Sequence, residues 1–99
     1  MKTNIKSKYN ILFAVNKDTE LKQIQNYICD VFGGYSTTRM RGGWKDNETK
    51  EVIEEVSYKI EIITDKNQNL IQTLCNFIKE VANQKEVFYY KEMINLVVC

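Results

Sequence analysis

The residues best suited to chemistry in this sequence are two arginines. Arg39 and Arg41 are the only arginines among 14 basic residues, and they stand two positions apart. The planar guanidinium of arginine donates to both oxygens of a phosphate or carboxylate, whereas lysine acts as a compact point charge. Because side chains alternate along a strand, both arginines share one face if the segment is extended. The pair therefore predicts a local anion-binding site.

Hydroxyl and aromatic side chains accompany this pair. In an extended segment Tyr35, Thr37 and Lys45 lie on the arginine face, and Trp44 stands one step away beside two flexible glycines. The arginines could hold a phosphate while an aromatic ring stacks on a base. The predicted ligand-binding residues are Tyr35, Thr37, Arg39, Arg41, Trp44 and Lys45.

Each of these features also has a purely structural interpretation. Arg41 could pair with Glu55 across a hairpin, where a surface ion pair contributes little. Trp44 could pack in a core or an interface. Gly33-Gly34 follows a helical pattern, so a helix end is the better interpretation than a backbone nest for an anion.

The composition excludes most familiar catalytic designs. The chain has no histidine, which removes Ser-His-Asp and Cys-His machinery and His-ligated zinc. Glu54, which interrupts an apolar strand face, and its neighbour Glu55 are the only plausible carboxylate bases. For Glu54, a position near the sheet margin, where the hairpin projects past the helices, is the better interpretation. We expect no metal, no cofactor and no catalysis.

The charge and the cysteines narrow the class of protein further. A net charge of +1 provides no extended field for a polyanion, so we expect no binding to extended nucleic acid. Cys29, Cys75 and Cys99 have no paired spacing and are expected to be buried or terminal reduced thiols. No apolar run is long enough for a membrane span or a signal peptide, so we expect a cytoplasmic protein.

Hydrophobic periodicity predicts the order of the elements. Residues 9–15 have strand character, Asp18 is a candidate N-cap, and an apolar helical stripe then runs to Val31 before Gly33. A long hairpin follows, with its turn at residues 46–50. A second stripe consists of Leu70, Leu74, Phe77, Ile78 and Val81. The end of the chain predicts either a short hairpin turning at Lys91-Glu92 or one bulged strand, with one ring of Tyr89-Tyr90 facing the core.

The two arms of the long hairpin suggest a register. If Lys45 pairs with Glu51, Arg41 lies opposite Glu55 and Trp44 lies opposite Val52. In this register basic residues lie opposite acidic ones, and apolar residues lie opposite apolar ones.

The resulting order β-α-β-β-α-β, with an optional last strand, is typical of a ferredoxin-like α+β domain. We expect residues 1–8 to be a flexible lead-in and residues 9–99 to form a single domain. Both helices should pack on one face of an antiparallel sheet. The other face is then open or covered by a second subunit, and a chain of 99 residues buries little surface by itself, so we expect a homo-oligomer.

One stretch resembles a family of small bacterial and phage proteins. It runs from Phe32-Gly33-Gly34 through Thr38 and Gly42-Gly43-Trp44 to the acidic Glu54-Glu55, and the tail at Asn83-Gln84-Lys85-Glu86-Val87 resembles the family's last helix-to-strand junction. The resemblance covers about residues 9–98 and implies a ferredoxin-like fold. Some small phage proteins of this broad kind look like counter-defence factors that capture nucleotide immune signals or block a host protein.

These observations lead to one prediction of function and two alternatives. We expect a non-enzymatic protein that binds a small phosphorylated or nucleotide ligand, and the resemblance suggests sequestration of a signal in a host cytoplasm. One alternative is a protein-protein inhibitor or assembly module. The other is a small nucleotide-acting enzyme with Glu54 or Glu55 as its base.

Overall fold

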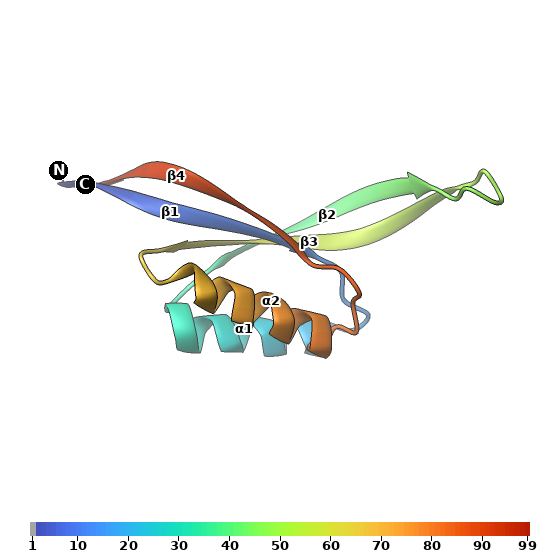
Figure 1. Ribbon diagram of the computed structural model, residues 1–99, viewed down its shortest axis with the longest axis horizontal. Helices are drawn as coiled ribbons and strands as arrows, with labels where there is room; N and C mark the ends of the chain where they lie inside the picture. The colour runs from blue at the N-terminus through green and yellow to red at the C-terminus, as the bar shows by residue number, and fades with distance from the viewer. Residues whose placement is uncertain (1) are drawn as a thin grey trace.

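The protein is a four-stranded antiparallel sheet with two helices on one face (Figure 1). The computed structural model describes residues 2–99, and the side chains of residues 3–99. Its elements are β1 (Lys2–Phe13), α1 (Asp18–Phe32), β2 (Ser36–Lys45), β3 (Val52–Thr64), α2 (Gln68–Val81) and β4 (Phe88–Val98). The strand order is β2-β3-β1-β4. The predicted β-α-β-β-α-β architecture is confirmed.

The core lies between the helices and the sheet face that they cover, here called the helix-side face. Alternate residues of the two central strands point into it, among them Tyr9, Ile11 and Phe13 of β1. Side chains from both helices meet them, and the rings of Tyr27 and Phe77 stack with centroids 4.4 Å apart. The opposite sheet face, here called the open face, carries no helix (Figure 1).

Local hydrogen bonds define both helix starts, and the first differs from the sequence prediction. Glu20 accepts the backbone N–H groups of Asn16 and Lys17 at 2.8 and 3.2 Å, and Asp18 is already helical. Glu20, not Asp18, therefore satisfies the free donors at this end. Asn67 caps α2 by accepting from the N–H of Asn69 at 2.8 Å. Gly33 ends α1 with φ 90°, as predicted.

The second helix buries most of the expected stripe. Leu74 and Ile78 are buried, and Phe77 and Val81 pack against the core, whereas Leu70 is exposed. Ile71 and Cys75, which the stripe did not include, are also buried. The periodicity identified the helix, but it did not identify each core position.

The last strand corrects the prediction of a terminal hairpin or a bulge. β4 pairs with β1 in a single register from Lys2↔Val98 to Leu12↔Phe88, and Lys91 and Glu92 lie inside the strand. Tyr89 packs near Tyr9 on the helix-side face and Tyr90 is exposed on the open face, so the predicted division of the two rings is confirmed. The polar pair Lys91-Glu92 tolerates this position because β4 is an edge strand.

Residues 2–8 belong to β1 and not to a lead-in, which corrects the expected boundary. They pair with the second half of β4 beyond the end of the helices (Figure 1). Their polar composition hid the strand, because no helix covers either face of this part. Met1 lies outside the described residues.

The long hairpin has a register one residue away from the predicted one. Arg41 lies opposite Val56, Trp44 opposite Ile53, and Lys45 opposite Val52. The turn is responsible: the N–H of Asp46 donates to the carbonyl of Glu51 at 2.9 Å, and the N–H of Lys50, whose φ is 63°, donates to the carbonyl of Asp46 at 2.9 Å. Turn geometry therefore overrides the pairing of charges.

Two strand pairs extend past the helices at opposite ends of the molecule (Figure 1). The start of β1 and the end of β4 form one extension, and the hairpin end of β2 and β3 forms the other, here called the β2–β3 arm. The molecule accordingly measures 54 × 23 × 22 Å. The β2–β3 arm carries three of the six predicted binding residues, Arg41, Trp44 and Lys45.

Candidate functional site

The predicted binding residues divide between the two faces of β2. Thr37, Arg39, Arg41 and Lys45 lie on the helix-side face, and Gln25 of α1 donates to the hydroxyl of Thr37 at 3.1 Å. Trp44 lies on the open face with Met40. Tyr35 precedes the strand. The structure therefore brings the arginines together but places Trp44 behind them.

The arginine pair is exposed and has no carboxylate partner among the described residues. Arg39 lies opposite Tyr58 and Arg41 opposite Val56, and neither forms an ion pair in the described part of the chain. The expected Arg41–Glu55 pair is wrong, because Glu55 lies opposite Gly42 on the other face. Glu54 shares the arginine face but is exposed on the arm, beyond the helices. These guanidinium groups are free to meet an anion.

The open side of the β2–β3 arm borders a cleft of about 790 Å³. Leu12, Trp44 and Phe88 contribute apolar surface to it, and Trp44 and Phe88 are 50% and 61% exposed. The floor continues to Phe13 and Ala14 at the end of β1. We call these two exposed rings the ring platform, because a planar ligand can stack on either ring.

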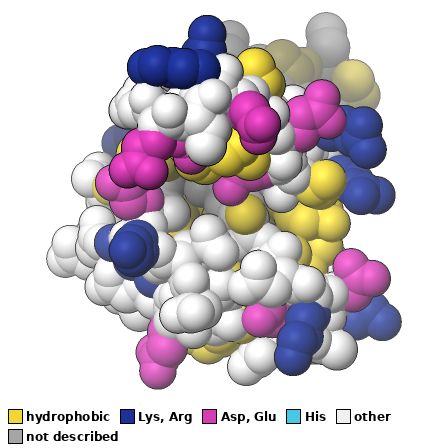
Figure 2. Space-filling model, turned by 90° about the vertical axis from the view of Figure 1, so that its right-hand side faces the viewer, with side chains coloured by type: hydrophobic (Ala, Val, Ile, Leu, Met, Phe, Trp, Pro, Cys, Tyr) yellow, Lys and Arg dark blue, Asp and Glu magenta, His cyan; other side chains and the backbone are white. Residues whose placement is uncertain are grey.

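The polar lining of this cleft is mainly acidic and amide in character. Glu55 and Ser57 come from β3, and the connection between α2 and β4 contributes Asn83, Gln84, Lys85 and Glu86. Asn83 adopts φ 50°, a conformation that favours a sharp turn after the helix. Figure 2 views this end of the molecule and shows a hollow with hydrophobic side chains inside and acidic side chains beside it.

The cleft contains one residue of the predicted site and several that the sequence did not single out. Trp44 was predicted, whereas Phe88 and the polar residues of the connection were not. The sequence indicated residues 83–87 only as part of a family resemblance, not as binding residues. Their position next to Trp44 depends on the long-range pairing of β4 with β1, and no local pattern in residues 83–87 indicates it.

Tyr35 belongs to a separate, smaller hollow of about 230 Å³ at the other end of β2. Phe32, Gly34, Ser36, Glu61 and Ile63 complete its lining. Tyr35 and Trp44 lie at opposite ends of β2, and the structure does not unite them in one pocket.

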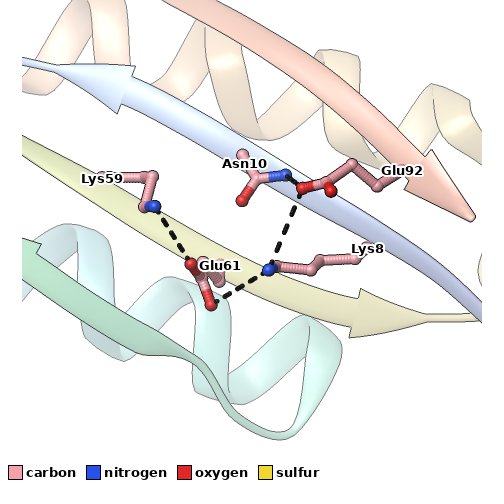
Figure 3. Close-up of polar contacts among 5 residues, drawn as sticks. All are labelled: Lys8, Asn10, Lys59, Glu61 and Glu92. Atoms are coloured by element: carbon pink, nitrogen blue, oxygen red, sulfur yellow. Dashed lines mark hydrogen bonds and ion pairs between the residues drawn. The ribbon is translucent and has the colours of Figure 1, made fainter. Parts of the chain in front are cut away.

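The centre of the open face carries a network of charged and amide side chains (Figure 3). Glu61 lies 3.6 Å from Lys8 and 3.2 Å from Lys59, and Glu92 lies 3.9 Å from Lys8. Asn10 donates to Glu92 at 2.8 Å, but its side-chain oxygen is buried and has no partner. The sequence offered one signal for this network, an asparagine inside an otherwise apolar strand.

The cysteines differ from one another in exposure. Cys29 is exposed, which corrects the expectation of a buried thiol, and Cys99 is exposed at the chain end. Cys75 lies on the buried side of α2, and this burial raises the pKa of its thiol to about 11, although the nearby Lys79 opposes the shift. A thiol that stays protonated is a poor nucleophile. All three cysteines are free.

Residues 2–99 offer neither a metal-ligand cluster nor a membrane-spanning helix. They contain no group of three or more acidic or cysteine side chains that could hold a metal ion. Neither helix is long and apolar enough to cross a membrane.

Comparisons with known proteins identify structural relatives but no relatives by sequence. No family model matches the chain, and no curated protein matches it. Among solved structures, a phage SAM lyase bound to S-methyl-5'-thioadenosine shares 15% identity and superposes with a TM-score of 0.66, over 94% of this chain and 90% of that one. The chain has a ferredoxin-like fold.

Two other structural neighbours lead to the same fold. CutA from Synechococcus elongatus shares 8% identity with a TM-score of 0.66, over 94% of this chain and 82% of that one. GlnK from B. subtilis, in complex with ATP, shares 16% identity with a TM-score of 0.60, over 89% and 83%. At these identities the likeness shows a shared fold and leaves function to the site itself.

Proposed function

We propose that this protein binds a small nucleoside- or nucleotide-like ligand in the cleft beside Trp44 and releases it unaltered. The observation that carries the proposal is the pair of exposed rings, Trp44 and Phe88, bordering one cleft of about 790 Å³. A base can stack on such rings, and stacking contributes about 1–3 kcal/mol per base. The volume is within the range of about 300–1,000 Å³ common for small-molecule sites.

The structural neighbours support this ligand class as an analogy. The phage lyase is bound to a thioadenosine and GlnK is bound to ATP, so the fold accommodates adenine-containing molecules in those proteins. Sequestration of a nucleotide signal, as a phage counter-defence factor in the host cytoplasm, is the biological role we propose from the sequence resemblance.

Arg39 and Arg41 form a second proposed contact, for an anion. They lie on the helix-side face of β2, and that strand is a sheet edge. A phosphorylated ligand stacked on Trp44 would have to reach around this edge to touch them. The arginine pair is therefore proposed as an anion site that is distinct from the ring platform, with Thr37 and Lys45 on the same face.

The open face supports the further proposal that the protein is a homo-oligomer. Its centre is a network balanced between two lysines and two glutamates. The exposed Tyr90 lies on the same face. A second copy seated there would cover the Tyr90 ring.

One observation favours an enzyme as a second candidate function. Glu55 lines the cleft, so its carboxylate could act as a base on a bound nucleotide, whereas Glu54 lies on the opposite face and could not. An inhibitor of a host protein is the remaining alternative, and it would use the open face.

A fluorescence titration tests the proposed function directly, because Trp44 is the only tryptophan. The purified protein is titrated with adenosine, AMP, cyclic AMP and a cyclic dinucleotide, and any bound ligand is recovered by heating and identified by mass spectrometry. We expect a saturable change in Trp44 fluorescence and intact recovery. Recovery of an altered product would favour the enzyme, and no change with any ligand would contradict the proposal.

A matched pair of variants locates the ligand. Phe88→Ala should weaken binding, because it removes one ring of the cleft. Ile5→Ala should leave binding unchanged, because Ile5 is exposed at the other end of the molecule.

A further inference from the structure

The cleft beside Trp44 carries charges that select among small aromatic ligands. We infer that it takes an uncharged or positively charged nucleoside-like molecule in preference to a phosphorylated one, with Glu55 and Glu86 facing the positive or hydroxyl-bearing end. This inference rests on the proposed function, since it concerns the same cleft. It narrows the proposed ligand class of this cleft from nucleosides and nucleotides to nucleosides, so a phosphorylated signal would have to be held by the separate arginine pair.

The ionisable groups in the lining carry the first part of the argument. They are Glu55, Glu86 and Lys85, and the remaining polar lining consists of the hydroxyl of Ser57 and the amides of Asn83 and Gln84. Two carboxylates against one ammonium disfavour a phosphate, because like charges repel, although salt screens this repulsion between exposed groups. Carboxylates accept hydrogen bonds from ribose hydroxyls and amines.

The orientation of α2 adds to this negative character. The helix ends at Val81, and its last turn leads directly into the lining residues Asn83 and Gln84. The C-terminal end of a helix carries partial negative charge, since its last carbonyls lack partners within the helix. Three of the last four are satisfied locally, since the carbonyls of Ile78, Lys79 and Glu80 accept backbone N–H groups from the residues that follow the helix, at 2.9, 3.0 and 3.4 Å. The carbonyl of Val81 has no such partner among these bonds. The helix end still favours a cation over an anion.

The nearest arginines do not compensate for these charges. Arg39 and Arg41 share a face of β2 with Lys45, while Trp44 and the neighbouring Glu55 point to the other face. In the cleft itself the indole ring of Trp44 lies beside the carboxylates of Glu55 and Glu86. A cation can bind over this ring, and a neutral base can stack on it.

Three ligands that differ only at the 5' position test the inference: adenosine, AMP and 5'-amino-5'-deoxyadenosine. Binding to the full chain is measured by calorimetry and by Trp44 fluorescence, at low and high salt. We expect the amine to bind about tenfold more tightly than AMP, because its ammonium group can donate a hydrogen bond to a carboxylate of the cleft. The preference should shrink as salt screens the charges.

Neighbouring glutamates provide a matched control. Glu55→Gln and Glu86→Gln should each reduce the preference for the amine over AMP. Glu54→Gln, one residue away but exposed on the opposite face, should leave the preference unchanged. Because all three variants replace an exposed carboxylate by its isosteric amide, we expect each to fold.

The outcomes separate this inference from the proposed function. AMP binding as tightly as the amine, or more tightly, would overturn the inference while keeping the cleft as a ligand site. A preference that Glu54→Gln removes and Glu55→Gln keeps would also overturn it. If none of the three ligands binds, the proposed function itself fails.

Discussion

The two faces of β2 offer opposite chemistry within one strand. The helix-side face carries Arg39, Arg41 and Lys45, all of them exposed. The open face carries Trp44, which borders a cleft together with Glu55 and Glu86. One face is basic and suited to anions, and the other is aromatic and acidic. Residues adjacent in sequence therefore face surfaces of opposite charge.

This contrast shows why spacing along a strand must be interpreted together with the partner strand. The alternation of side chains correctly groups the arginines and separates Trp44 from them. It cannot say which face becomes a cleft. That depends on where β1, β4 and the connection after α2 lie, and these come from distant parts of the chain.

The largest expected effect concerns assembly through the open face. Tyr90→Asp should convert the proposed homo-oligomer to a monomer, because it places a carboxylate on that face beside Asn10 and Glu92. Met93→Asp is the control, since Met93 is exposed on the helix-side face of the same strand. Sedimentation velocity measures both variants. A wild-type protein that sediments as a monomer at micromolar concentration would contradict the proposal.

The second effect concerns the ring platform. Trp44→Ala should weaken adenosine binding by about 10–100-fold, the loss expected when one stacking ring is removed. Thermal stability should stay close to that of the wild type, because Trp44 is half exposed. Calorimetry provides the affinity, since the variant has no tryptophan to report it. Unchanged affinity would place the ligand elsewhere.

The third effect concerns the basic face. If the arginine pair grips an anion, Arg41→Lys should weaken pyrophosphate binding by roughly 1–3 kcal/mol, because lysine keeps the charge but loses the two-point geometry. Glu55→Gln should not change pyrophosphate binding, since Glu55 lies on the other face. If both variants weaken pyrophosphate binding equally, the two faces act as one site and the account is contradicted.

The smallest effect concerns the reactivity of the three cysteine thiols. Cys29 and Cys99 should react with a thiol reagent at pH 8, and Cys75 should not, because it is buried and its pKa is about 11. Since this pKa exceeds the ordinary 9.0, the contribution of Cys75 to folding stability is complete below pH 9 and is lost as the pH rises toward 11. Mass spectrometry of the labelled protein checks the pattern. Rapid labelling of Cys75 in the folded protein would contradict this prediction, because it would show that the core around α2 opens to solvent.

The fold was more predictable than the site. Hydrophobic periodicity located both helices and the long hairpin, and their order predicted the ferredoxin-like topology that the structure confirms. It missed residues 2–8 of β1, because a strand pair without a covering helix has no apolar pattern to display. It also misplaced the hairpin register, because Asp46 and Lys50 set the turn through backbone hydrogen bonds.

The site was less predictable because it is assembled from long-range neighbours. The residue type of Trp44 marked it as a candidate. Phe88 and Glu86 line the same cleft only because β4 pairs with β1. The network around Asn10 likewise joins β1, β3 and β4. No local pattern encodes such proximity.

The most direct test of the separation between the faces is an adenosine titration of the wild type and of the double variant Arg39→Lys, Arg41→Lys, followed through Trp44 fluorescence. The account predicts a saturable fluorescence change with the same Kd in both proteins, since the arginines face away from the cleft. A Kd that rises about tenfold in the arginine variant, or calorimetric binding without any change at Trp44, would contradict it.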